Sequence, residues 1–158
     1  MRASFANILH ERMKTDNRIF LIVGDLGFGL FNEIRKDFPD RFINCGAAEQ
    51  AMMGISVGLS IQGKIPFTYS ITPFLLWRTA ETIRNYVNHE SIPCKLIGSG
   101  RDNCYLHDGF SHFAGDDFKL MECFENINCR CPETKEEIPN IVDEMINNPL
   151  PYYLNLKR

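Results

Sequence analysis

The run RIFLIVGD at residues 18–25 constrains the fold of this chain more than any other segment. It is continuously apolar rather than alternating, which is typical of a strand buried on both faces of a parallel sheet. Helical patterns separate it from further strand patterns, which lie at 42–45, 64–71, 93–100, 126–131 and 151–156. Strands that alternate with helices predict an open, mostly parallel α/β sheet of about six strands, with helices on both faces.

Apolar residues at helical spacing predict the helices between these strands. The helix that begins near Glu49 is expected to end at about Ile61, because Gly63 is a C-terminal signal. Pro73 suits the start of one long helix over 74–89, since proline is tolerated in a first turn. The other helices are expected at 2–14, 30–38, 113–124 and 134–148, and a loop of little periodicity at 101–112.

Length and charge bound the class of protein. The chain has 158 residues, and we expect one domain over 1–158. The net charge is -3, so nothing suggests nucleic acid or an anionic membrane as a partner. The amphipathic start MRASFANILHERMK lacks the apolar core of a signal peptide, and no run is long enough to span a bilayer.

The six cysteines form no CxxC motif, and most lie in strand-like runs. They are interpreted as free thiols of a cytoplasmic protein, because disulfides are rare in reducing compartments. Cys129 and Cys131 could face the same way from a strand, but no cluster of His or Cys supplies further zinc ligands. We therefore predict no metal site on this chain.

Ligands of open α/β sheets bind outside the carboxyl ends of the strands. This rule selects four stretches as the candidate site, and no GxGxxG or GxxxxGK[ST] motif indicates a dinucleotide or P-loop site among them. The stretches are 24–29, 45–49, 69–77 and 98–112.

Glu49 is a single acidic residue in the otherwise apolar start of its helix. Met52, Met53 and Ser56 follow at three, four and seven residues, so they share its face. A buried, unpaired charge is costly, so the carboxylate has either a partner or a chemical role. A simpler interpretation is an acid favoured by the dipole at a helix N-terminus.

The blocks around these stretches, taken in order, resemble the pyrimidine-binding domain of transketolase and deoxyxylulose-phosphate synthase. FINCGAAEQ and DGFSH are the strongest matches, and the ordered series covers nearly the whole chain. The blocks are VGDLGFG at 23–29, FPDRFINCGAAEQAMMGISVGLSIQGKIPF at 38–67, YSITPFLLWRTAETIRNYV at 69–87, and KLIGSG with YLHDGFSH within 95–112.

The resemblance implies thiamine diphosphate as cofactor, with its own aminopyrimidine removing the proton from the thiazolium carbon. Glu49 matches the acid that hydrogen-bonds the pyrimidine nitrogen and favours the reactive tautomer. Phe74 and Trp77 match aromatic side chains against which the pyrimidine stacks, although aromatic residues at this spacing are more often core. Asp25 matches an acid near the thiazolium; it could equally be a loop or cap aspartate.

The resemblance also implies substrate contacts. Asp108 and His112 match residues that contact substrate hydroxyls or move protons at the reacting carbon, where a loop histidine alone would be a surface group. Arg2 and Arg158 match phosphate-binding arginines, and guanidinium groups suit phosphate recognition. The phosphate set is incomplete, because Gly29 replaces a serine of the family and a histidine is missing near Arg101. Arg101 is a possible substitute, and terminal arginines are also often merely solvated.

The GDG…N motif that holds the diphosphate and Mg²⁺ in this family does not occur in the sequence, and we expect neither the diphosphate-binding domain nor the small C-terminal domain on this chain. The resemblance therefore implies half of a cofactor site, with Mg²⁺ and the diphosphate held by a separate subunit in a heterotetramer. The expected activity is transfer of a two-carbon ketol unit between sugar-like substrates. The alternatives are decarboxylative transfer from a 2-keto acid, as in deoxyxylulose-phosphate synthase, and a non-catalytic domain kept for assembly or regulation.

Overall fold

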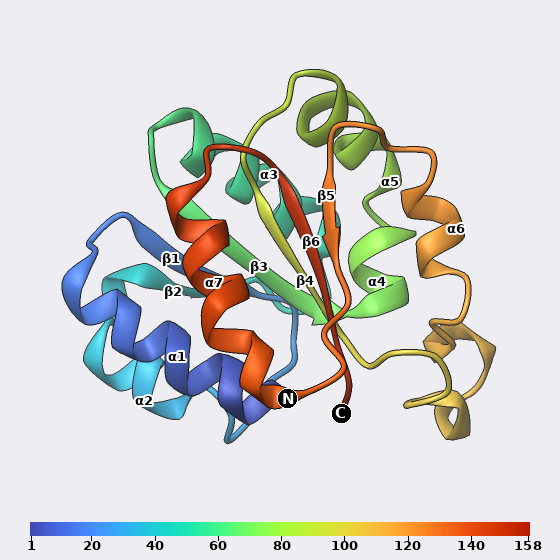
Figure 1. The fold of residues 1–158 in the computed structure, drawn as a ribbon, viewed down its shortest axis with the longest axis horizontal. Helices are drawn as coiled ribbons and strands as arrows, with labels where there is room; N and C mark the ends of the chain where they lie inside the picture. Colours follow the sequence, from blue (N-terminus) through green and yellow to red (C-terminus); the bar gives the residue numbers. More distant parts are fainter.

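In the computed structural model, which describes residues 1–158, one sheet of six strands runs through the molecule, and every strand pair is parallel (Figure 1). The predicted α/β class is thus confirmed, and each predicted strand run contains one strand. In the order β2-β1-β3-β4-β6-β5 across the sheet, their bounds are Phe42–Asn44, Ile19–Val23, Ile65–Ile71, Lys95–Ser99, Tyr152–Leu156 and Asn128–Arg130.

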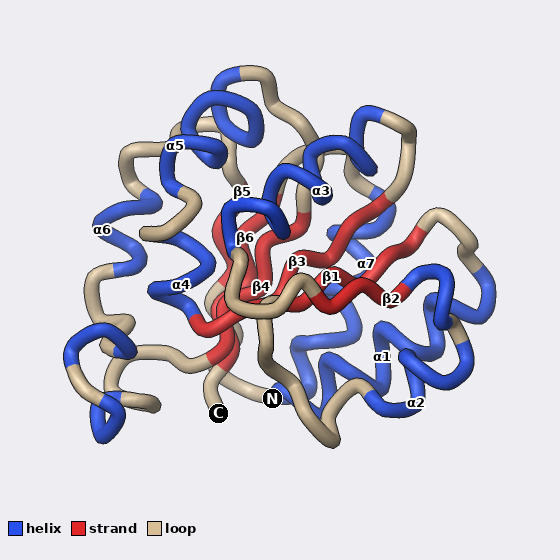
Figure 2. The backbone as a smooth tube through the Cα atoms, turned by 180° about the vertical axis from the view of Figure 1, so that it is seen from behind, coloured by secondary structure: helices blue, strands red, loops and turns tan.

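Helices cover both faces of this sheet, as predicted. Helices α1, α2 and α7 pack on the face seen in Figure 1, and Figure 2 shows α3 to α6 on the opposite face. No helix has the length and apolar character needed to cross a membrane. The bounds are α1 Arg2–Thr15, α2 Asn32–Asp37, α3 Glu49–Ile61, α4 Thr72–Leu76, α5 Ala80–Thr82, α6 Asp117–Met121 and α7 Ile138–Asn147.

The sheet separates two apolar cores, which explains why its strands read as continuous apolar runs. One core joins the sheet to α1 and α7 through side chains such as Phe5, Leu9 and Val142. The other joins it to α3 and α4 through side chains such as Met52 and Leu75. Adjacent residues of β1 point to opposite cores, since Leu21 belongs to the first and Ile22 to the second.

The prediction of one continuous helix over 74–89 is wrong. Helix α4 ends at Leu76, a turn covers residues 77–79, and the short α5 continues into a π-helical segment at Ile83–His89. The hydroxyl of buried Thr79 donates to the Leu75 carbonyl at 2.5 Å. Such a side-chain bond competes with the backbone ladder and bends helices, and here it accompanies the break.

The helix predicted over 113–124 is also shorter than expected, because α6 covers only Asp117–Met121. The N–H of Ala114 donates to the carbonyl of Asp102 in an isolated antiparallel bridge, which holds this part of the segment extended. The segment predicted over 134–148 opens with a 3₁₀ turn at Lys135–Glu137 before α7. A reciprocal capping box between Thr134 and Glu137 begins this turn.

The strand order reverses at β1, which lies between β2 and β3. After β1 the chain forms β2 on one side of β1, and it then crosses back to form β3 on the other side. The connections that leave β1 and β3 therefore run in opposite directions from the carboxyl ends of these neighbouring strands. Such a switch point leaves a crevice where ligands bind in open α/β sheets. Both chain ends also lie near this carboxyl edge (Figure 1).

Candidate functional site

Glu49 reaches the carboxyl edge because a tight turn joins β2 to α3. The side chain of Asn44 accepts a hydrogen bond from the N–H of Gly46 at 2.9 Å, and Gly46 has a φ of +64°. Glycine adopts this left-handed conformation without strain. Helix α3 then begins at Glu49, which places the carboxylate in its first turn, where the helix dipole favours negative charge.

Gly24, just after β1, lies against both this carboxylate and the side chain of Ser70. A Cβ atom at Gly24 would lie 3.5 Å from Oε1 of Glu49 and 3.1 Å from the hydroxyl oxygen of Ser70. The next residue, Asp25, is exposed, and its N–H donates to the carbonyl of Gly46 at 3.0 Å. Asp25 therefore ties the end of β1 to the turn that precedes Glu49, at the edge where sequence analysis expected it.

The buried Glu49 has an ionic partner, Arg78. Glu49 is only 5% exposed, and its Oε2 lies 2.9 Å from Nη1 of Arg78, whose side chain is 45% exposed. The sequence pattern left open whether this carboxylate has a partner, and Arg78 was not among the predicted site residues. The available signal was the position of Arg78 four residues after Phe74, which would place both on one side of a helix.

Arg78, Phe74 and His112 contact one another in series beside Glu49, and the three are called the Phe74 cluster. The guanidinium carbon of Arg78 lies 3.6 Å from the centroid of the Phe74 ring, within the range of a cation–π contact. The ring of His112 meets Phe74 edge to face, with centroids 4.8 Å apart and planes inclined by 63°. The structure thus brings together three residues that sequence analysis assigned to the site: Glu49, Phe74 and His112.

A half-open cavity of about 360 Å³ lies beside the Phe74 cluster. Phe74 and Trp77 belong to neither apolar core, and Trp77 is 51% exposed. The alternative that both are core residues therefore does not agree with the structure. The lining residues are Pro73, Phe74, Trp77, Arg78, Phe110, Ser111, Phe113 and Asp116.

The DGFSH block folds as two single 3₁₀ turns, at Leu106–Asp108 and Phe110–His112, joined at Gly109 with a φ of +96°. The second turn presents His112 to Phe74, and Nδ1 of His112 lies 3.0 Å from the hydroxyl of Ser111. Asp108 is exposed and pairs with His107 at 3.3 Å rather than with His112. The two predicted residues therefore lie on the same loop but make separate contacts.

Arg2 and Arg158 come from opposite ends of the chain, and both lie close to the side chain of Tyr105. Nη1 of Arg2 lies 2.6 Å from the Tyr105 hydroxyl, and the guanidinium of Arg158 lies 5.2 Å from the centroid of that ring. Both arginines line a second cavity of about 700 Å³, together with the loop that carries Phe28. Arg2 and Arg158, which the resemblance assigned to an anionic group of the substrate, thus form a basic patch at the same edge.

Arg101 does not join that patch. It is 4% exposed, and its guanidinium donates to the carbonyls of Pro132 at 2.6 Å and Asn155 at 3.1 Å. It also pairs with Glu133 at 3.0 Å. These contacts secure the segment after β5 to β6, so the geometry gives Arg101 a structural role and separates it from Arg2 and Arg158.

The wall behind the cavity is held by Asp117 at the start of α6. This buried carboxylate accepts hydrogen bonds from the hydroxyl of Tyr153 at 2.7 Å, from the N–H of Phe118 at 2.8 Å and from the side chain of Asn155. Burial raises the pKa of Asp117, and these three donors act in the opposite direction. The network fixes α6 to β6 and holds the neighbouring Asp116 at the cavity.

A buried carboxylate at the switch point of a parallel sheet, together with an aromatic face and a half-open cavity after the neighbouring strands, defines a small-molecule-binding domain of the open α/β class. Comparison with known families gives the particular one. Residues 1–158 match the model of the transketolase pyrimidine-binding domain, and the chain belongs to that family.

Similar proteins include subunits of split enzymes. The chain is 35% identical, over 77% of its length, to one of the subunits of an apulose-4-phosphate transketolase from Actinobacillus succinogenes. It is 30% identical over its full length to a putative transketolase C-terminal section of Methanocaldococcus jannaschii. Among solved structures, it matches an inactive β4 tetramer of a split-gene transketolase with a TM-score of 0.87 and 30% identity over 99% of the chain. The chain spans 39% of the first of these and 50% of the other two.

Proposed function

We propose that this chain supplies the pyrimidine-binding half of a thiamine-diphosphate enzyme that transfers a two-carbon ketol unit between sugar-like substrates. The observation that carries the proposal is the buried carboxylate of Glu49 at the switch point of the sheet, linked through Arg78 to the ring of Phe74. Membership of the transketolase pyrimidine-domain family supports the choice of cofactor.

The residues fit the pyrimidine half of that cofactor. A flat ring needs an aromatic face, which Phe74 offers at the half-open cavity, and Trp77 stands on the same wall. The ring nitrogen needs an acid in a site with little water, and Glu49 is such an acid. When bound, thiamine diphosphate supplies the carbon nucleophile that attacks a ketone.

We assign the remaining site residues to contacts with the substrate and the cofactor. We assign to His112, which lies against Phe74, the transfer of a proton at the reacting carbon or an adjacent hydroxyl. Asp108, exposed on the same loop, accepts a hydrogen bond from a substrate hydroxyl. Arg2 and Arg158 bind an anionic group of the substrate, since both line the second cavity. We assign to Asp25, which follows Gly24 at the end of β1, a place near the thiazolium half of the cofactor.

We further propose a separate subunit that holds the diphosphate and Mg²⁺ and forms a heterotetramer with this chain. The names of similar proteins support this arrangement, because they include a transketolase subunit and a split-gene transketolase. The cofactor would then lie between the two kinds of subunit, with its pyrimidine on this chain.

The test is Glu49→Gln in the complex with the diphosphate-domain subunit, thiamine diphosphate, Mg²⁺ and a ketose donor. We expect turnover to fall by about 10²-fold or more, in the range of general acid–base effects. Glu81→Gln is the matched control, because Glu81 lies exposed on α5 outside the cavity. Unchanged turnover in Glu49→Gln would refute the role of Glu49.

Two further measurements separate the alternatives. Comparison of pyruvate with a ketose as donor distinguishes decarboxylative transfer from ketol transfer, because only pyruvate releases CO₂. Calorimetry of the complex tests the non-catalytic alternative: absence of thiamine diphosphate binding with the partner present would favour a domain kept for assembly or regulation.

A further inference from the structure

Arg78 has no part in the proposed reaction, yet it makes both contacts that a bound pyrimidine would make on this chain. Its guanidinium carbon lies 3.6 Å from the centroid of the Phe74 ring, and its Nη1 lies 2.9 Å from Oε2 of Glu49. A guanidinium is planar and carries N–H groups at its edge, so it can stack and donate to a carboxylate at once. An aminopyrimidine combines the same two properties, a flat face and an edge nitrogen that shares a proton with an acid.

The two members of this ion pair differ in their freedom to move. Glu49 is 5% exposed and lies in the first turn of α3, packed near the backbone of Gly24. The side chain of Arg78 is 45% exposed and extends from the turn at residues 77–79, between α4 and α5. Arg78 can therefore swing into solvent on its flexible stem, whereas Glu49 cannot leave.

Departure of Arg78 without a replacement would be unfavourable. A buried carboxylate that loses its partner retains the cost of its lost hydration, and the Phe74 ring would lose the group that covers it. A ligand that offers both a flat face and an N–H to the carboxylate restores the two contacts. Exchange of Arg78 for such a ligand is thus easier than simple opening.

We propose that Arg78 occupies the pyrimidine site of the cofactor-free chain and must leave before the pyrimidine ring can enter. The inference rests on the proposed function, because it takes Glu49 and Phe74 as the pyrimidine contacts. When only a fraction of the protein is open for binding, the apparent affinity falls by that fraction. Arg78 would therefore set the affinity of the chain for the cofactor without touching it in the bound state.

The single tryptophan of the chain offers a readout that does not depend on activity. Trp77 precedes Arg78, lines the same cavity and is 51% exposed, so its fluorescence should respond to a ring bound there. The full chain is titrated with two probes: a 4-aminopyrimidine without thiazolium or diphosphate, and thiamine diphosphate with Mg²⁺. The variant is Arg78→Met, which keeps an apolar stem and removes the guanidinium.

Two further variants accompany it. Arg84→Met is the matched control, because exposed Arg84 bonds only to the side chain of its neighbour Asn85. Arg78→Lys keeps the charge opposite Glu49 but lacks the planar group that stacks on Phe74. It thus tests the proposal even if Arg78→Met folds poorly, and circular dichroism of each variant reports its folding.

We expect Arg78→Met to bind both probes about tenfold more tightly than the wild type if about nine-tenths of the wild-type chain is closed by Arg78. Arg78→Lys should fall between the two, and Arg84→Met should match the wild type. Wild-type binding that is equal to or tighter than that of both Arg78 variants would overturn the inference and leave the proposed function intact. No saturable signal in any of the proteins, with the diphosphate-domain subunit present as well as without it, would overturn both, since the chain would then have no pyrimidine site.

Discussion

The rings of Phe74 and His112 meet edge to face across the carboxyl edge of the sheet, with centroids 4.8 Å apart. Phe74 belongs to α4, which follows β3, and His112 belongs to the loop that follows β4. The contact joins the proposed wall of the cofactor site to the loop proposed to handle the substrate. We therefore expect a substitution of either ring to alter the position of the element that carries the other ring.

Replacement of Phe74 by leucine should weaken thiamine diphosphate binding by up to about tenfold, because aromatic stacking contributes about 0.5–1.5 kcal/mol beyond area burial. Phe74 lies outside both cores, so the free energy of unfolding should change little. Calorimetric titration of the complex measures the affinity. Trp77→Leu, a change at a more exposed ring, should have a smaller effect, and equal affinity in wild type and Phe74→Leu would contradict the stacking role.

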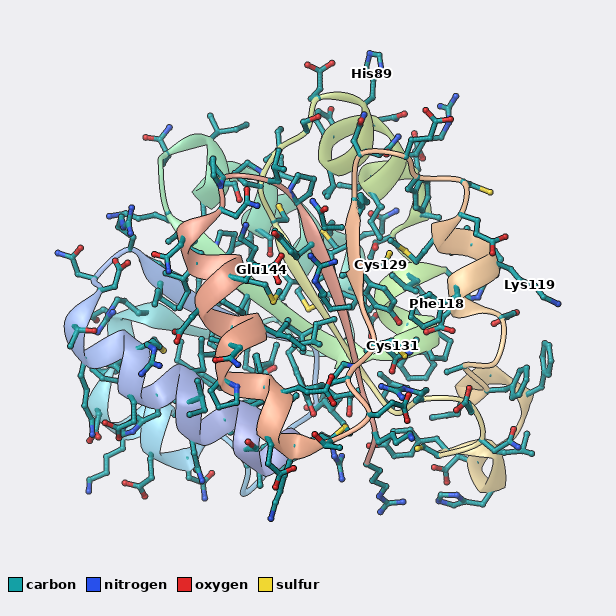
Figure 3. All side chains as sticks on the ribbon, viewed as in Figure 1. His89, Phe118, Lys119, Cys129, Cys131 and Glu144 are labelled. Carbon is teal, nitrogen blue, oxygen red and sulfur yellow. The ribbon has the colours of Figure 1, made fainter.

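Replacement of His112 by asparagine should lower turnover by about 10²-fold, the lower end of general acid–base contributions, and leave cofactor affinity nearly unchanged. Steady-state kinetics and calorimetry of the complex check the two parts. His89→Asn is the control, because Figure 3 shows His89 at the end of the molecule opposite the chain termini, and its side chain is 81% exposed. If both histidine variants retain full turnover, His112 is not a catalytic residue.

Replacement of Arg101 by methionine should lower the free energy of unfolding by about 2–4 kcal/mol, because it leaves buried carbonyls of Pro132 and Asn155 without a donor. Urea unfolding measures the change. Arg158→Met should show the opposite pattern, with unchanged stability and a raised KM for an anionic substrate, since Arg158 is exposed in the second cavity. A stable Arg101→Met protein with a raised KM would instead return Arg101 to the substrate site.

Stability should rise between about pH 8 and pH 10.5 through one buried group, Lys95 at the start of β4. Its ammonium donates to the carbonyls of Asn148 and Leu150, and burial lowers the pKa of Lys95 from 10.5 to about 8. In this range the unfolded chain binds the proton and the folded chain does not, so rising pH favours the folded state by up to about 3 kcal/mol.

Urea unfolding of the wild type and of Lys95→Met, measured between about pH 8 and pH 10.5, isolates this contribution. The quantity of interest is the free energy of unfolding of the wild type minus that of the variant. The buried Tyr69 and Cys94 have raised pKa values and lower the stability of both proteins as pH rises, so they largely cancel in the difference. A difference that stays flat or falls with pH would show that Lys95 keeps its proton in the folded state.

The fold was largely predictable because its signals are local. The continuous apolar run of β1 predicts burial on both faces, and the bounds expected for the helix from Glu49 to Ile61 agree with α3, which Gly46 and Gly63 flank. The break after Leu76 was not predictable from periodicity, because it accompanies a hydrogen bond from the side chain of Thr79. Periodicity records which faces are apolar and says little about such a competing bond.

The site was predictable in its parts and not in its pairing. Motifs selected Glu49, Phe74 and His112, and the fold brings them together. The bond between Glu49 and Arg78 joins positions 29 residues apart, and it depends on how α3 and the segment from α4 to α5 pack on the same face of the sheet. Likewise, nothing in a loop sequence tells whether an arginine such as Arg101 turns into the protein or out of it.

The bridge between Asp102 and Ala114 closes the loop after β4 at its base. Within the loop, Tyr105 bonds to Arg2 and His112 meets Phe74, so these two residues tie it to the rest of the domain, whereas Asp108 and Phe110 are exposed. Insertions or grafts at this exposed tip should therefore leave the scaffold that holds Glu49 as it is. Under the proposed function, substrate preference can thus change through the tip while Glu49 and Phe74 continue to hold the cofactor.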